Sequence, residues 1–219
     1  MKAVGIYLRT FPRVSETFVS EQANRLTQFQ PKFVANTLLQ ETSLPCVALS
    51  QSDRFKLKQT SYLLTRAPNL YSACWSELRE LSLIHAHFGP NGVYALPLAR
   101  KLEVPLVVTF HGYDITLNRQ AIWRTGKLLY YQLLWHEREL QERAAGFIAV
   151  SQFIRDRLIA HGYPRKKILL HYIGVDTQKF APNSDRAGGR YILCVGRHTE
   201  KKRHRYPNAC LCSHCGATS

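Results

Sequence analysis

Histidines, glycines and a carboxylate occur together in two short segments, each of which lies at the end of an apolar run. One segment carries His85 and His87, and the other reads His111-Gly112-Tyr113-Asp114. A neutral imidazole can donate or accept a hydrogen bond with a sugar hydroxyl, and a glycine lets the backbone approach a ligand closely. The second segment therefore indicates a polar ligand site in a surface loop, and a packed core histidine fits it less well.

The spacing of His85 and His87 places both imidazoles on one face of a strand, where they could bind zinc. A catalytic zinc site needs a third ligand and an open position, and no nearby cysteine or carboxylate has the spacing to supply it. We therefore expect no metal. The residues that follow indicate a tight turn into a helix whose backbone approaches a ligand closely. They are Gly89, Pro90, Asn91 and Gly92.

Two further loops carry groups that suit an anion. Ser15 and Thr17 lie where a helix should begin, so their hydroxyls and the free amides there can bind a phosphate. An ordinary capped loop between a strand and a helix stays open as the alternative. Near the other end of the chain, Arg197 and Lys202 could clamp a diphosphate as a bidentate fork and a point charge. Taken alone, that segment also fits a solvated basic loop.

Short runs of β-branched and aromatic residues alternate with segments of helical length, which is typical of a parallel α/β sheet. Several runs are apolar on both faces, as strands covered by helices on both sides must be. The expected fold is a Rossmann-like, doubly wound parallel sheet with its ligands beyond the carboxyl ends of the strands. The loops of Ser15, His85 and His111 should then share one edge. The expected strands are 3–8, 32–38, 83–88, 106–110, 146–150 and 168–173.

Local signals also place helices and boundaries. A helix is expected over residues 17–28, and another begins at Ser151 as its cap and ends at Gly162 in a left-handed turn. After residue 175 the composition becomes polar and loop-like. We expect a first domain over 1–175, a linker over 176–190, the first strand and loop of a second domain over 191–202, and an aberrant tail over 203–219.

The chain is strongly basic, with 30 Lys and Arg residues against 15 Asp and Glu and a formal charge of +15. That charge should attract polyanions, phosphorylated ligands or an anionic membrane face. The basic residues are scattered rather than gathered in a stripe with aromatics, which argues against nucleic acid. Neither a spanning helix nor a signal peptide is recognisable. A cytoplasmic location is expected, with peripheral attachment to the inner face of the cytoplasmic membrane as a further hypothesis.

Four segments form recognisable motifs: F-P-x-x-S-E-T-F at 11–18, H-x-H-F-x-x-x-G at 85–92, T-x-H-G-x-D at 109–114, and a helix that begins A-V-S at 149–151. Residues 171–182 are similar to a hinge sequence of the form N-G-V-D-x-x-x-F-x-P. Through these segments the chain resembles the N-terminal part of family-4 retaining glycosyltransferases, in particular those of bacterial exopolysaccharide and lipopolysaccharide biosynthesis. The resemblance covers residues 1–202.

The resemblance implies half of a two-domain GT-B architecture. It further implies transfer of a hexosyl group from a nucleotide-sugar donor to a saccharide or lipid-linked acceptor, with retained configuration and without cofactor or metal. His111 would contact the transferred sugar and Asp114 would hold His111 or the acceptor, which makes them the candidate catalytic residues. Arg197 and Lys202 would neutralise the departing diphosphate. The implied substrate-binding residues are Ser15, Glu16, Thr17, His87, Gly89, Asn91, Gly92 and Gly112.

The resemblance ends at Arg203, where the family has a glycine followed by a long helix. The cysteines and His214 of the tail match no common zinc spacing, which favours an out-of-frame tail. We therefore expect a truncated second domain and a chain that is inactive alone. A non-catalytic module that binds carbohydrate or a lipid-linked sugar is the alternative function. A Rossmann oxidoreductase is disfavoured because no G-x-G-x-x-G motif follows the first expected strand.

Overall fold

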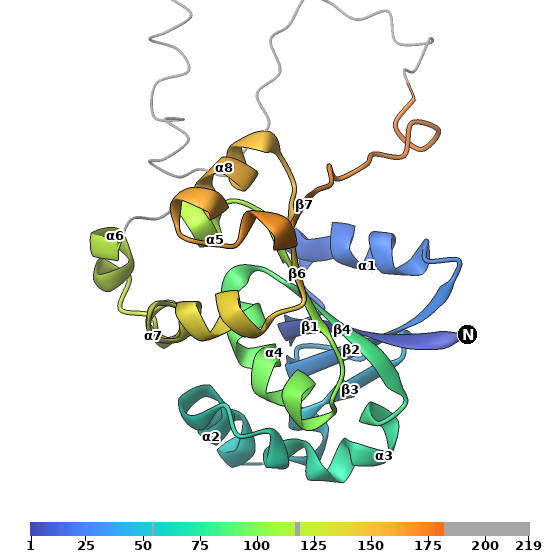
Figure 1. The fold of residues 1–219 in the computed structure, drawn as a ribbon. Helices are drawn as coiled ribbons and strands as arrows, with labels where there is room; N and C mark the ends of the chain where they lie inside the picture. The colour runs from blue at the N-terminus through green and yellow to red at the C-terminus, as the bar shows by residue number, and fades with distance from the viewer. Residues whose placement is uncertain (54, 117–118, 182–219) are drawn as a thin grey trace, which may run out of the picture. The chain divides into compact units, whose positions relative to one another are not determined.

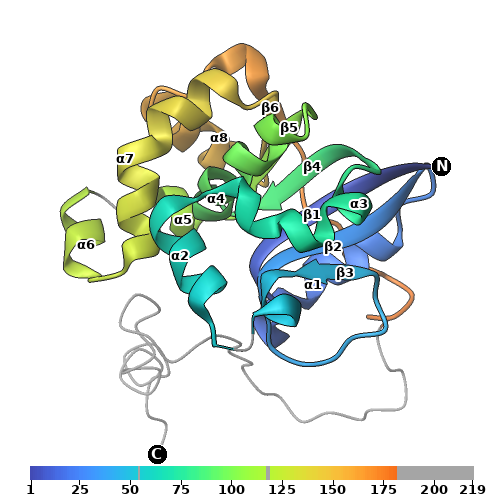
Figure 2. The same cartoon turned by 90° about the horizontal axis from the view of Figure 1, so that it is seen from below.

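The computed structural model describes residues 1–53, 55–116 and 119–181 (Figure 1). Met1–Gly174 forms one compact unit, and Val175 begins another. The unit is built on a sheet of seven parallel strands in the order β3-β2-β1-β4-β5-β6-β7, with helices packed against it (Figures 1 and 2). The expected Rossmann-like parallel sheet is confirmed.

The strands are β1 (Lys2–Phe11), β2 (Phe29–Leu38), β3 (Cys46–Ala48), β4 (Leu81–His87), β5 (Leu106–Phe110), β6 (Gly146–Ala149) and β7 (Ile168–Leu170). The helices are α1 (Thr17–Asn24), α2 (Leu57–Thr65), α3 (Trp75–Leu78), α4 (Gly89–Lys101), α5 (Tyr113–Thr116), α6 (Arg119–Arg124), α7 (Leu128–Arg143) and α8 (Gln152–Ala160). Short 3-10 helices lie at Val14–Glu16, Leu49–Ser52, Pro68–Cys74 and Arg165–Lys167. Among the described residues, no helix is long and apolar enough to cross a membrane.

The strand bounds differ from the expected ones where pairing decides them. β1 continues to Phe11, which pairs with Leu38 at the end of β2. β7 pairs with β6 only as far as Leu170, so the strand expected to reach residue 173 ends where its partner ends. The three-residue strand β3 was not predicted, because so short a run has no visible period.

The two faces of the sheet are covered differently (Figure 1). Val19 and Ala23 of α1 pack on one face against β1 and β2. On the other face, α2, α4 and α7 join a larger apolar core that includes Tyr7 and Ile84. The Ser151 hydroxyl accepts the Ile154 amide at the start of α8, as predicted.

Pro97 lies inside α4 and lacks the N–H that would bond the Val93 carbonyl one turn earlier. Arg66, at the end of α2, supplies the missing donor, because its Nη1 atom lies 3.2 Å from the Val93 carbonyl oxygen. The Tyr62 hydroxyl of the same helix donates to the next carbonyl, that of Tyr94, at 2.6 Å. Side chains of α2 thus stabilise α4 at its proline.

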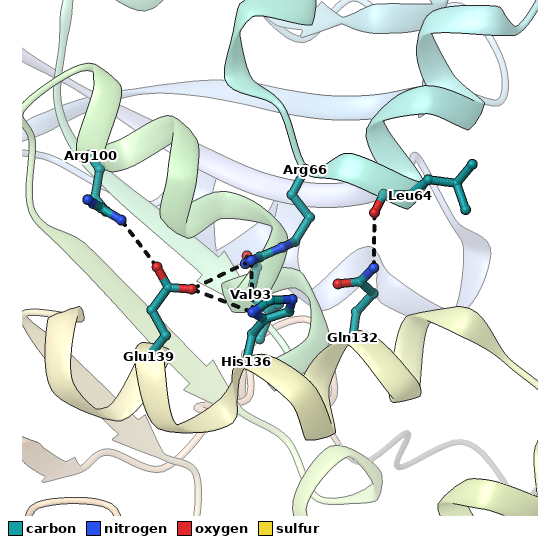
Figure 3. A network of polar contacts seen from close by, with 7 residues as sticks. All are labelled: Leu64, Arg66, Val93, Arg100, Gln132, His136 and Glu139. Carbon is teal, nitrogen blue, oxygen red and sulfur yellow. Dashed lines mark hydrogen bonds and ion pairs between the residues drawn. The ribbon is translucent and has the colours of Figure 1, made fainter.

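Arg66 also connects these helices to α7 (Figure 3). Its Nη2 atom donates to His136 Nδ1 at 2.9 Å and lies 3.5 Å from the Glu139 carboxylate, which Arg100 of α4 contacts at 3.2 Å. An arginine cannot accept a hydrogen bond, so His136 Nδ1 is the acceptor and the ring is neutral. Burial and the Arg66 charge lower the pKa of His136 accordingly. The network joins α2, α4 and α7 on one side of the sheet.

The second unit is described only at its beginning. There the Asp176 carboxylate accepts the amides of Gln178 and Lys179, and the Asp176 carbonyl accepts the Phe180 amide. Most of the expected linker over 176–190, all of 191–202 and the tail over 203–219 lie outside the described residues.

Candidate active site

The carboxyl ends of β1, β4 and β5 lie at one edge of the sheet, because these neighbouring strands run parallel. The ring of His111, just after β5, is surrounded there by rings from the other two loops. The centroid distances to His111 are 5.0 Å for Phe18, 5.3 Å for His87 and 4.6 Å for Phe88. The prediction that the Ser15, His85 and His111 loops share one edge is confirmed.

Three imidazoles form a row along this edge. His85 Nε2 lies 2.7 Å from the Thr109 hydroxyl, and the rings of His85 and His87 lie 4.4 Å apart. His87 Nδ1 lies 3.1 Å from His111 Nε2, within hydrogen-bond distance. The row runs from within the sheet to the loop after β5, so each ring limits the orientation of the next.

Burial keeps these histidines uncharged. It lowers the pKa of His85 and of His111 to about 4. For His87 burial comes first and the neighbouring histidines add to it, so its pKa lies well below the ordinary value. All three rings are therefore neutral near pH 7, and they act as hydrogen-bonding groups and not as cations.

The hydrogen bond between His87 and His111 also favours one tautomer. His111 Nδ1 is buried and has no partner among the described residues. An unpaired buried N–H is costlier than an unpaired acceptor. The proton of His111 is therefore best placed on Nε2, from which it donates to His87 Nδ1.

Asp114, three residues after His111, is only 5% exposed. Its two carboxylate oxygens accept the amides of Gly89 at 2.8 Å and Gly112 at 2.9 Å. Burial raises the pKa of Asp114, although these amide bonds act in the opposite direction. The carboxylate therefore ties the start of α4 to the His111 loop, and it acts on His111 through the backbone.

Residues 16–179 match the model of Glycosyltransferase Family 4. The chain belongs to this family. WcaL of Escherichia coli (strain K12), named as a colanic acid biosynthesis glycosyltransferase, is 35% identical over 122 residues, which are 53% of this chain and 28% of that protein. WcaL of Salmonella typhimurium is 34% identical over 122 residues, again 53% of this chain and 28% of that protein. The matched part is thus under a third of these relatives.

A solved structure supports the fold of this family-4 chain. The crystal structure of Anabaena Alr3699/HepE in complex with UDP matches it with a TM-score of 0.53 and 15% sequence identity. The match covers 84% of this chain and 47% of the Anabaena protein.

The glycines of the family-4 motif after β4 have a packing role in the structure. A Cβ atom on Gly89 would lie 2.5 Å from the Phe110 ring, and one on Gly92 would lie 2.8 Å from Val108. Their close approach in the structure is to β5, because α4 packs directly on that strand, and their role toward a ligand stays a prediction. Asn91 is buried too, and its side chain donates to the His87 carbonyl at 2.7 Å. Gly112 has a φ of +134°, a backbone conformation that favours glycine.

The first family-4 motif lies at the start of α1. Ser15 and Thr17 are exposed, and no side chain caps α1, which directly follows the 3-10 turn Val14–Glu16. Glu16 lies 3.8 Å from Arg13, and burial raises the pKa of Glu16. Arg197 and Lys202 lie outside the described residues.

Sequence reasoning missed the aromatic wall around His111. Phe18 and Phe88 belong to two of the recognised motifs, and this placement was the available signal. Phe88 also has a φ of +71°, a strained conformation for a bulky residue. In the part of the chain that the structure describes, no group of three His, Cys, Asp or Glu side chains could hold a metal ion.

Proposed function

We propose that this domain forms the acceptor side of a retaining glycosyltransferase in polysaccharide biosynthesis. The enzyme would transfer a hexosyl group from a nucleotide-sugar to a saccharide or lipid-linked acceptor. The observation that carries the proposal is the neutral pair of His87 and His111 beside Phe18 and Phe88, at the edge where this fold binds ligands. The names of the WcaL relatives and the UDP in the Anabaena complex support the substrate classes.

The site suits a sugar for chemical reasons. A neutral imidazole attracts no competing anion, and the rings of His111, Phe18 and Phe88 can pack against the apolar C–H face of a pyranose. The start of α1, which no side chain caps, suits a donor phosphate, because helix N-termini attract anions. Arg197 and Lys202 would stabilise the charge that develops on the leaving diphosphate.

This chemistry needs neither a metal nor a pair of acid and base carboxylates. Both oxygens of Asp114 are occupied by backbone amides, so they do not offer a general base to the acceptor. The rate would depend on holding donor and acceptor together and on stabilising the leaving group. Retention without a metal is part of the proposal.

Saturation-transfer NMR on the full chain tests the binding step, with oligosaccharides in one arm and nucleotide-sugars in the other. We expect saccharide signals that disappear in His111→Ala and persist in His171→Ala, whose histidine is exposed outside the site. A transfer assay with a ¹³C-labelled nucleotide-sugar then reads the anomeric configuration of any product. Saccharide binding without transfer would agree with a chain that is inactive alone, and transfer by this chain would overturn that expectation. Absence of both binding and transfer would refute the proposal.

A further inference from the structure

Aromatic and basic side chains, all exposed except the partly buried Tyr131, form a surface on α6, on α7 and on the residue before α7. We call it the aromatic-basic surface; it consists of Trp123, Arg124, Lys127, Tyr131 and Trp135. Trp123 is 50% exposed and Trp135 is 57% exposed. The Tyr131 ring lies 4.8 Å from that of Trp123 and 6.1 Å from that of Trp135, and its hydroxyl donates to the Trp123 carbonyl. The three rings thus form one continuous group.

The fold turns these aromatics outward. The two helices already have a buried apolar side. Ile122, next to Trp123, is 4% exposed. Leu133, which lies between Tyr131 and Trp135 in the sequence, is 2% exposed. The exposed rings are therefore a second apolar surface of the same helices. Large exposed aromatic groups of this kind mark interaction sites.

The charge of this region points to an anionic partner. Between Asp114 and Glu137 the chain has no acidic residue, whereas Arg119, Arg124 and Lys127 are basic. Arg124 and Lys127 are exposed, and neither pairs with a carboxylate in the described residues. Tryptophan and tyrosine favour the boundary between lipid and water, and basic side chains are attracted to anionic headgroups.

We propose that the aromatic-basic surface docks on an anionic lipid bilayer. The docking rests on this surface alone. Only its purpose, to bring a lipid-linked acceptor to the site, rests on the proposed function. Tyr113, directly after Gly112, is half exposed and its ring lies 5.9 Å from that of Tyr130 on α7. The His111 loop therefore contacts α7 at Tyr130, the residue before Tyr131 of the surface. A bilayer bound there would present a lipid-linked acceptor beside the candidate site.

Vesicle co-sedimentation of the full chain tests the docking. We expect binding to vesicles of phosphatidylglycerol and phosphatidylcholine, little binding to phosphatidylcholine alone, and weakening with salt. Trp123→Ala/Trp135→Ala and Arg124→Glu/Lys127→Glu should each reduce binding by about tenfold or more. The matched controls are Phe153→Ala, an exposed aromatic of α8, and Arg79→Glu/Lys101→Glu, exposed bases at the far ends of α3 and α4. Circular dichroism checks that each variant is folded.

Equal loss in the controls, or binding that survives both surface variants, would overturn the proposal. Tryptophan fluorescence gives a second reading, because the chain has three tryptophans and two of them lie on this surface. Brominated phosphatidylglycerol should quench the tryptophan fluorescence of the Trp75→Phe variant, which keeps Trp123 and Trp135. It should leave Trp123→Phe/Trp135→Phe unquenched, because Trp75 packs against the core. Neither assay measures sugar transfer, so failure here is distinct from failure of the proposed function.

Discussion

The Nδ1 atom of His87 lies 3.1 Å from the Nε2 atom of His111 and joins the end of β4 to the loop after β5. A ring held in this way presents one edge to a ligand in a fixed orientation. Asp114 fixes the same loop through the Gly112 amide. The site therefore has two independent restraints, which can be removed separately.

Replacing His87 with Ala should weaken saccharide binding by up to about tenfold, because His111 loses one hydrogen bond that orients it. His87→Gln can still offer an acceptor and should recover part of the loss. Titration calorimetry with an oligosaccharide that the wild type binds measures both. A His87→Ala chain with unchanged affinity would show that His111 needs no such partner.

The buried histidines should make the domain less stable in acid. The ordinary histidine pKa near 6.5 falls to about 4 for His85 and His111 in the folded chain. Between these values the unfolded state binds more protons, so stability present above pH 6.5 is lost as the pH falls toward 4. Urea unfolding measures the free energy of unfolding at pH 7 and at pH 5. The difference between the two values should be smaller for His85→Gln than for wild type. The exposed His171→Gln provides the comparison, and an equal reduction there would argue against the buried row.

Arg66→Ala should lower the free energy of unfolding by roughly 1–3 kcal/mol, because it leaves the buried Val93 carbonyl without its donor. Pro97→Ala restores a backbone N–H one turn after Val93. In that background the loss of Arg66 should cost less. A double-mutant cycle measured by urea unfolding gives the coupling. Additive effects would mean that Arg66 acts only through His136 and Glu139.

Asp114→Asn should destabilise the domain by roughly 1–3 kcal/mol, since an amide has one accepting oxygen where the carboxylate has two. The new NH₂ group would face a backbone N–H. Saccharide binding should weaken as well, because the His111 loop loosens. Asp156→Asn changes an exposed carboxylate on α8 and is the control for stability and for binding. If Asp114→Asn kept full stability but lost transfer, a direct catalytic role would be favoured.

The sequence by itself determined the class of fold and the edge at which the site lies. Alternation of apolar runs with helical segments requires a parallel sheet, and parallel strands bring their following loops to one edge. Local chemistry was enough to place the cap at Ser151 and the left-handed glycine at position 162. Such signals depend on neighbours within a few residues.

Only the tertiary structure decided what those loops contact. The end of β7 depends on its partner strand β6. The need for a glycine at position 89 of α4 depends on the ring of Phe110, which lies on β5. The same holds for the two amides bound by Asp114 and for the neutral state of His111, which arises from burial among rings of two other segments. Burial and distance are properties of residues far apart in the chain, so no local pattern records them.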